Sequence, residues 1–183
     1  MQRQKKPSAS PGSVDRAAFS KVALGYLNRR DASRNKLQAH LERWVARSHS
    51  SEQVLAARPL IQELLERYQA SGLVDDARLA ENAVKSLRAR GKSARAISYK
   101  LATQGVASVS IDAALSADRR ENGESELSAA RALARKRKLG VFRPQAERAE
   151  KQRKDLAVLA RAGFDFDTCR RALGSGDGAD DEF

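Results

Sequence analysis

The chain has 183 residues, of which 41% are hydrophobic and 32% are charged, and its formal net charge is +12 at pH 7. These proportions favour a folded, well-solvated helical protein over a disordered one. The sequence also excludes a membrane span, because none of its apolar runs approaches the roughly 18 residues that a span needs. The positive charge predicts attraction to a polyanion, such as nucleic acid or an acidic protein surface, although a basic protein can also lack such a partner.

The two ends of the chain differ in composition from its middle. Residues 1–15 are rich in Lys, Pro, Ser and Gly, and we expect a flexible basic arm there. Residues 174–183 combine glycines with acidic residues, and we expect a disordered acidic tail. The N-terminal residues lack the apolar region of a secretory signal. The single Cys169 excludes an internal disulfide, so we expect a cytoplasmic protein in which this thiol is a small buried hydrophobe.

Apolar residues recur at helical spacing between these ends, and a first three-helix unit is predicted over residues 16–74. Ser33 is expected to be the N-cap of a helix, and Ser50 has the capping-box spacing to Gln53 that begins another. Pro59 either lies in the first turn of a separate helix or kinks a single helix from residue 51 to residue 70. The apolar stripes of this unit contain Phe19, Ala23, Tyr26, Leu27, Leu37, Leu41, Trp44 and Val45.

The second unit, predicted over residues 75–120, has clear start and stop signals. Asp75 or Asp76 is expected to cap a helix that Gly91 ends, and Ser93 is expected to cap the next helix. The third unit is predicted over residues 121–173, with helices near residues 124–138, 145–162 and 166–173.

An internal repeat connects the second and third units. Residues 101–115 and 159–173 align without a gap at an offset of 58, and both have a glycine at a helix end followed by an apolar residue. Strand signals are nearly absent. The sequence therefore predicts an all-α protein, an elongated array of three tandem three-helix repeats whose small units support one another.

The residues that invite a catalytic interpretation have simpler explanations. Gly91-Lys92-Ser93 resembles the end of a phosphate-binding loop, but position 86 is Ser rather than Gly and no apolar strand precedes it. The pair Asp75-Asp76 is expected to supply a helix N-cap and a first-turn acid. The two histidines and the single cysteine form no metal-ligand cluster. We therefore predict no enzymatic activity, no cofactor and no catalytic or metal-binding residue.

Two basic clusters carry the binding chemistry. Residues 85–100 contain six basic residues and no acidic one, and residues 131–154 contain ten basic and two acidic ones. We expect these cations to project outward, where Arg can hold phosphates or carboxylates in bidentate fashion. Aromatic residues make up only 5% of the chain, so contact with the DNA backbone is a more economical form of nucleic-acid binding than base stacking. The predicted partner-binding residues are Arg88, Arg90, Lys92, Arg95, Arg135, Lys136, Arg137 and Lys138.

The central residues resemble a known family. Its central signature is similar to Gly72-Leu73-Val74-Asp75-Asp76-x-Arg78-x-Ala80, followed by Arg88-x-Arg90-Gly91, Ile97, Leu101, Gly105-Val106 and Ala114-Leu115. This is the RecX family of recombination regulators, and the similarity extends over residues 17–173. The chain departs from the family pattern in the first unit. There Trp44-Val45 replaces a Lys-Gly type of helix end, and residues 46–57 look inserted.

The resemblance implies an all-helical protein that binds in the groove of the RecA filament on single-stranded DNA. Members of this family typically inhibit ATP hydrolysis and strand exchange by RecA and limit filament growth, which places them in the control of recombination, DNA repair and the SOS response. The partner implied is therefore the RecA recombinase filament, with backbone contacts to single- or double-stranded DNA. We expect a monomer with no membrane contact.

The alternative is a protein that binds nucleic acid directly, such as a small helical transcription regulator or a nucleoid-type protein. Consecutive short helices joined by a glycine-containing turn also describe a helix-turn-helix. A two-fold dimer would be expected in that case, yet the sequence has no sustained heptad for a dimerisation helix.

Overall fold

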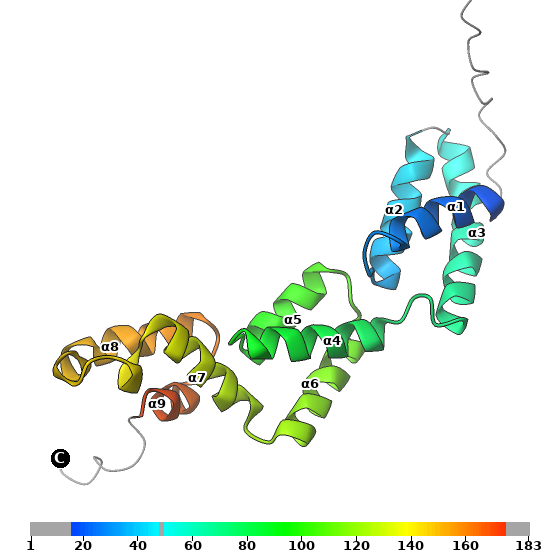
Figure 1. Cartoon of the computed structure of the whole chain (residues 1–183). Coiled ribbons are helices and arrows are strands. Elements are labelled where there is room, and N and C mark those ends of the chain that lie inside the picture. Colours follow the sequence, from blue (N-terminus) through cyan, green and yellow to red (C-terminus); the bar gives the residue numbers. More distant parts are fainter. Residues whose placement is uncertain (1–15, 48–49, 175–183) are drawn as a thin grey trace, which may run out of the picture. The chain divides into compact units, whose positions relative to one another are not determined.

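A computed structural model describes residues 16–47 and 50–174 of the chain (Figure 1). Within these residues all regular secondary structure is helical, which confirms the all-α prediction. The predicted basic arm, and the predicted acidic tail apart from Gly174, lie outside the described residues. The helices are α1 (Arg16–Leu27), α2 (Arg34–Ala46), α3 (Ser51–Ala70), α4 (Asp76–Ala89), α5 (Ala94–Thr103), α6 (Ser108–Asn122), α7 (Ser125–Arg137), the 3-10 helix η1 (Gly140–Phe142), α8 (Gln145–Arg161) and α9 (Phe166–Leu173).

The N-caps predicted at Ser33 and Ser50 are present. The Ser33 hydroxyl accepts a hydrogen bond from the Lys36 amide at 3.3 Å. Ser50 and Gln53 form the expected capping box, with side chain to backbone distances of 3.4 Å and 3.0 Å. Each bond satisfies a helix-terminal amide that has no partner within its own helix.

Pro59 lies inside α3, so residues 51–70 form one helix rather than two. A proline at this position leaves the carbonyl of Leu55 without its usual amide donor. Both residues are exposed, so water can satisfy that carbonyl, and this explains why the helix continues. Residues 51–57 of the segment that looks inserted are therefore the first turns of α3.

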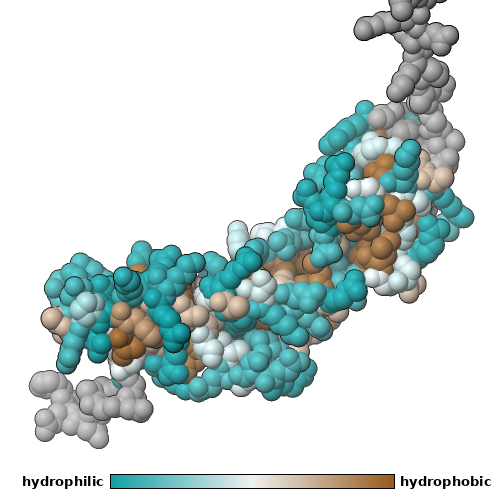
Figure 2. Space-filling model, in the orientation of Figure 1, coloured by the Kyte–Doolittle hydropathy of each residue, from teal (hydrophilic) through white to brown (hydrophobic). Residues whose placement is uncertain are grey.

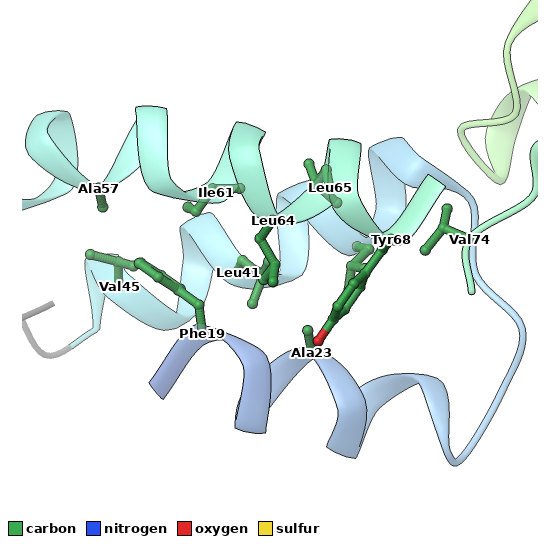
Figure 3. Close-up of a cluster of buried hydrophobic side chains, with 11 residues drawn as sticks. Phe19, Ala23, Leu41, Val45, Ala57, Ile61, Leu64, Leu65, Tyr68 and Val74 are labelled. Carbon is green, nitrogen blue, oxygen red and sulfur yellow. The ribbon is translucent and has the colours of Figure 1, made fainter. Parts of the chain in front are cut away.

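The first three helices bury one hydrophobic cluster (Figure 3). In this view the Phe19 side chain extends from α1 toward Val45 of α2, and Leu64 extends from α3 into the cluster near Leu41 of α2. The chain closes the end of the cluster after α3, where the Val74 amide donates to the Tyr68 carbonyl at 3.1 Å and Val74 is itself buried.

The chain divides into two compact units at Asp75 and Asp76, and the second unit contains α4 to α9. This unit has two hydrophobic clusters, one formed by α4, α5 and α6 and the other by α7, α8 and α9. Together with the cluster of the first unit, they confirm three successive three-helix groups. The boundary predicted at residues 120–121 lies within one compact unit, and the exact limits of the repeats remain predictions.

Candidate functional site

Arg88 is buried among three helices, so the expectation that this cation projects outward is wrong. Only 8% of the residue is exposed. Its Nε donates a 3.0 Å hydrogen bond to Asp118 Oδ2 on α6, and its Nη1 donates to Glu126 Oε2 on α7. The physical reason is its position four residues after the buried Val84, which places it on the apolar face of α4. Arg88 therefore ties α4 to α6 and α7.

The turn after α4 packs closely against α7. Gly91 has a φ of +72°, and a Cβ atom there would lie 2.8 Å from the Leu133 backbone nitrogen and 3.0 Å from the Ala129 carbonyl oxygen. Glycine alone combines this left-handed backbone with so close an approach. The predicted helix stop at Gly91 is confirmed, and the same residue brings Lys92 next to Leu133 of α7.

Hydrogen bonds fix the start of α5 to α7 and α8. Ser93 is fully buried, and its Oγ accepts from the Ala96 amide at 3.2 Å, as expected of an N-cap. The same hydroxyl donates to the Ala162 carbonyl oxygen at 2.6 Å. The Glu126 carboxylate of α7 accepts from the Ala94 amide at 3.2 Å. Because Ala162 directly follows α8, these bonds hold the end of α8 against the start of α5.

A cleft of about 450 Å³ lies where the α4–α5 turn meets α7 and α8. Its charged lining residues are Lys92, Arg137 and Arg161, all of them exposed. Leu133 and Val158 supply apolar surface beside them. Among the described residues that line this cleft, none is acidic. We refer to it as the basic cleft.

The basic cleft unites two predicted site residues and adds a third. Lys92 and Arg137 come from the two separate clusters of the sequence. Arg161 was not predicted because it lies outside both clusters, and the packing of α8 against α7, together with the hydrogen bond between Ser93 and Ala162, brings it to them. The other predicted residues that are exposed but do not line the cleft are Arg90, Arg95, Arg135, Lys136 and Lys138.

The cleft suits an anionic group with an apolar neighbour. No carboxylate of the described residues forms an ion pair with Lys92, Arg137 or Arg161, so their charges add rather than cancel. Concave walls of low dielectric concentrate such a field. The two guanidinium groups can each hold a carboxylate or phosphate through two hydrogen bonds, and the ammonium adds a point charge. On the face shown in Figure 2, hydrophilic residues cover most of the described surface.

His40, Cys169 and the pair Asp75-Asp76 lie in environments that suit a structural role. His40 stacks on Tyr26 with ring centroids 4.2 Å apart, and burial followed by the charges of Arg43 and Arg47 lowers its pKa. Cys169 is buried, which raises the pKa of its thiol. The helix α4 begins at Asp76, as the capping interpretation of the acidic pair requires.

The described part of the chain offers neither a metal site nor a membrane helix. Residues 16–47 and 50–174 contain no group of His, Cys, Asp or Glu side chains that could hold a metal ion. None of the helices in these ranges is long and apolar enough to cross a membrane.

Comparison with known proteins decides the family. The chain is 36% identical over 169 residues to the regulatory protein RecX of Myxococcus xanthus, and the match covers 90% of this chain and 89% of that protein. The chain belongs to the RecX family. The regulatory protein RecX of Chromohalobacter salexigens is 34% identical over 151 residues, with 82% of this chain and 88% of that protein covered. A family model described as the second three-helix domain of RecX matches residues 75–115 of this RecX-family chain.

Solved structures of RecX proteins share the fold. The crystal structure of RecX from Lactobacillus salivarius aligns with a TM-score of 0.66 and 18% identity, over 88% of this chain and 96% of that chain. Another crystal structure of a regulatory protein RecX aligns with a TM-score of 0.62 and 20% identity, over 87% of this chain and 73% of that chain. The resemblance to the RecX family that the central motif indicates is thus confirmed at the level of family and fold.

Proposed function

We propose that this RecX-family protein binds the RecA filament on single-stranded DNA and inhibits ATP hydrolysis, strand exchange and filament growth. Membership of a family whose relatives are named regulatory proteins is the observation that carries the proposal. The protein acts in this proposal as a binding protein and not as an enzyme. Its place of action is the cytoplasm, and it acts as a monomer.

The proposed contact surface is the basic cleft with the exposed cations near it. Lys92, Arg137 and Arg161 form its centre, and Arg90 and Arg95 flank Lys92 along the chain. Arg135, Lys136 and Lys138 continue it at the end of α7. Arg88 has no place in this surface because its guanidinium is buried. A surface with several separate cations can engage more than one anionic site of a filament, and such multiple contacts raise the affinity through effective concentration.

Direct binding to DNA, without RecA, is the second candidate function. The same cations favour it because phosphates and carboxylates are both anions. Tyr99 adds a specific observation, since its side chain is 75% exposed on α5, one turn after Arg95. An exposed aromatic ring beside a cation can stack on one base of a single strand.

The experiment that separates the two is ATP hydrolysis by RecA on single-stranded DNA, with the RecX-family protein added well below the RecA concentration. Inhibition at this ratio supports action on the filament, because one molecule then affects many RecA protomers. Inhibition only when the protein is abundant enough to coat the DNA, with a steep loss in added salt, contradicts the RecA proposal and favours direct DNA binding.

A further inference from the structure

We propose that the acidic segment of this chain, residues 177–182, occupies the basic cleft and competes there with an outside anionic partner. The segment contains Asp177, Asp180, Asp181 and Glu182. It is the only part of the sequence in which four acidic residues occur within six positions without a basic one. The cleft presents the opposite charge through Lys92, Arg137 and Arg161.

The chemistry of the cleft fits an acidic peptide better than a bare anion. Its three cations come from three different elements, the α4–α5 turn, α7 and α8. Leu133 and Val158 lie among them and offer apolar surface to a backbone or a small side chain. A free phosphate would use the cations alone, whereas an acidic segment that contains Gly178 and Ala179 can use both kinds of surface.

The path of the chain makes this contact possible. Gly174 caps α9 with a φ of +80°, and a Cβ atom there would collide with Val141 Cγ1, so the described chain ends against η1. Val141 is only four positions after Arg137, which lines the cleft. Residues 180–182 follow Gly174 by six to eight positions, and an extended chain of that length spans about 20–28 Å. The Cα atoms of Arg137 and Val141 are at most about 14 Å apart, because only four residue steps connect them. An extended segment of this length is therefore long enough to reach Arg137, which lines the cleft.

The contact is expected to be weak and competitive. Ion pairs between exposed side chains contribute little, and salt at physiological strength screens them over about 8 Å. A covalent tether of this length compensates, because it supplies an effective concentration in the millimolar range. Partial occupancy follows, so an outside partner binds with an affinity reduced by the fraction of clefts that are filled. The acidic segment would thus raise the concentration of an outside partner that is needed to fill the basic cleft.

A matched pair of full-length variants tests the proposal. The first is D177N/D180N/D181N/E182Q, and the second, E66Q/E81Q/D112N/E121Q, removes the same charge from exposed carboxylates of α3, α4 and α6. A fluorescein-labelled peptide of ten aspartates is the probe, with its Kd measured by anisotropy at 50 mM salt. We expect the first variant to bind the probe about three- to fivefold more tightly than the second, because it alone empties the cleft. Equal affinities would overturn the proposal, since both variants gain the same net charge.

Amide chemical shifts locate the contact independently of any partner. Comparison of the unsubstituted protein with the first variant should show the largest shift changes at Gly91, Lys92, Arg137 and Arg161, and 0.5 M salt should abolish them. The same carboxylate substitutions made in a K92Q/R137Q/R161Q background should produce no such changes. Changes that centre elsewhere, or that persist in this background, would overturn the assignment of the cleft. Because these measurements contain no RecA and no DNA, their failure leaves the proposed function untouched.

Discussion

The hydroxyl of Ser93 donates a 2.6 Å hydrogen bond to the backbone carbonyl of Ala162, 69 positions away in the sequence. The same oxygen caps α5 by accepting from the Ala96 amide. One buried side chain therefore both begins a helix and joins the α4–α6 group to the α7–α9 group. This bond is one of the contacts that hold the end of α8 at the α4–α5 turn, where the basic cleft lies.

Replacement of Ser93 by alanine should lower the free energy of unfolding by about 2 kcal/mol. About 1 kcal/mol comes from the lost N-cap, and a similar amount from the buried Ala162 carbonyl left without its donor. Urea denaturation followed by circular dichroism measures the change. Ser128, which is exposed on α7, provides the control, and S128A should change stability by less than about 0.5 kcal/mol. Equal stabilities of S93A and S128A would contradict the role assigned to this bond.

Removal of the Arg88 guanidinium should destabilise the protein strongly. In R88A the carboxylate of Asp118, which is 5% exposed, and that of Glu126 are left without their buried cation. The expected loss is about 3–5 kcal/mol in urea denaturation, because an unpaired buried charge is costly. The neutral triple variant R88M/D118N/E126Q should recover part of this loss.

The neighbouring R90A serves as the control for R88A, since Arg90 is exposed on the same chain segment. It should leave stability within about 0.5 kcal/mol of the unsubstituted protein. If R88A were as stable as R90A and lost only partner binding, Arg88 would be a contact residue after all.

Gly72 and Gly91 have nearly the same backbone conformation, so alanine substitutions at these positions distinguish the cost of backbone strain from the cost of close packing. Gly72 has a φ of +71°, and a Cβ atom added there would meet nothing within 4 Å, whereas Gly91, at +72°, would place its Cβ 2.8 Å from the Leu133 backbone nitrogen. G72A should therefore cost about 1 kcal/mol for the left-handed conformation alone. G91A should cost at least about 2 kcal/mol more, because backbone must move. Thermal or urea unfolding measures the stability of both variants. Equal losses of stability would show that α7 can shift to accommodate the added Cβ atom at position 91.

Charge reversal in the basic cleft should weaken binding without unfolding the protein. K92E/R137E/R161E is expected to reduce the affinity for RecA filaments on single-stranded DNA at least about tenfold, since each lost contact to a charged group is worth about 1 kcal/mol or more. Fluorescence anisotropy of labelled filaments gives the affinity, and circular dichroism checks the helical content. K85E/K100E/R153E changes the same number of exposed cations outside the cleft. Similar losses in both variants would mean that net charge, and not the cleft, governs binding.

Protonation of His40 should destabilise the first unit. Burial and the charges of Arg43, Arg47 and Arg30 lower the pKa of His40 in the folded protein below its usual value of 6.5. The unfolded chain then binds the proton more readily, so stability is complete above about pH 7 and falls as the pH drops through the lowered folded pKa. Urea midpoints between pH 7.5 and pH 5.5 measure this slope. H40Q removes the group, and an unchanged slope in that variant would assign the effect to another residue.

The amino-acid sequence by itself determined the helices and most of their ends. Ser33, Ser50 and Ser93 cap helices as predicted, and Gly91 ends one, because a cap or a left-handed turn is a local matter of a few consecutive residues. The continuity of α3 through Pro59 was left open by the sequence, because it depends on whether water reaches the carbonyl of Leu55.

The candidate site required the tertiary structure. Charge clustering identified Lys92 and Arg137 but could not show that they share a cleft, and it offered no reason to choose Arg161. Charge clustering also predicted that Arg88 lies on the surface, whereas in the structure Arg88 is buried against Asp118 and Glu126. Which cation faces water and which one pairs inside depends on carboxylates 30 and 38 positions away, and only packing of α4, α6 and α7 brings those carboxylates within hydrogen-bond distance.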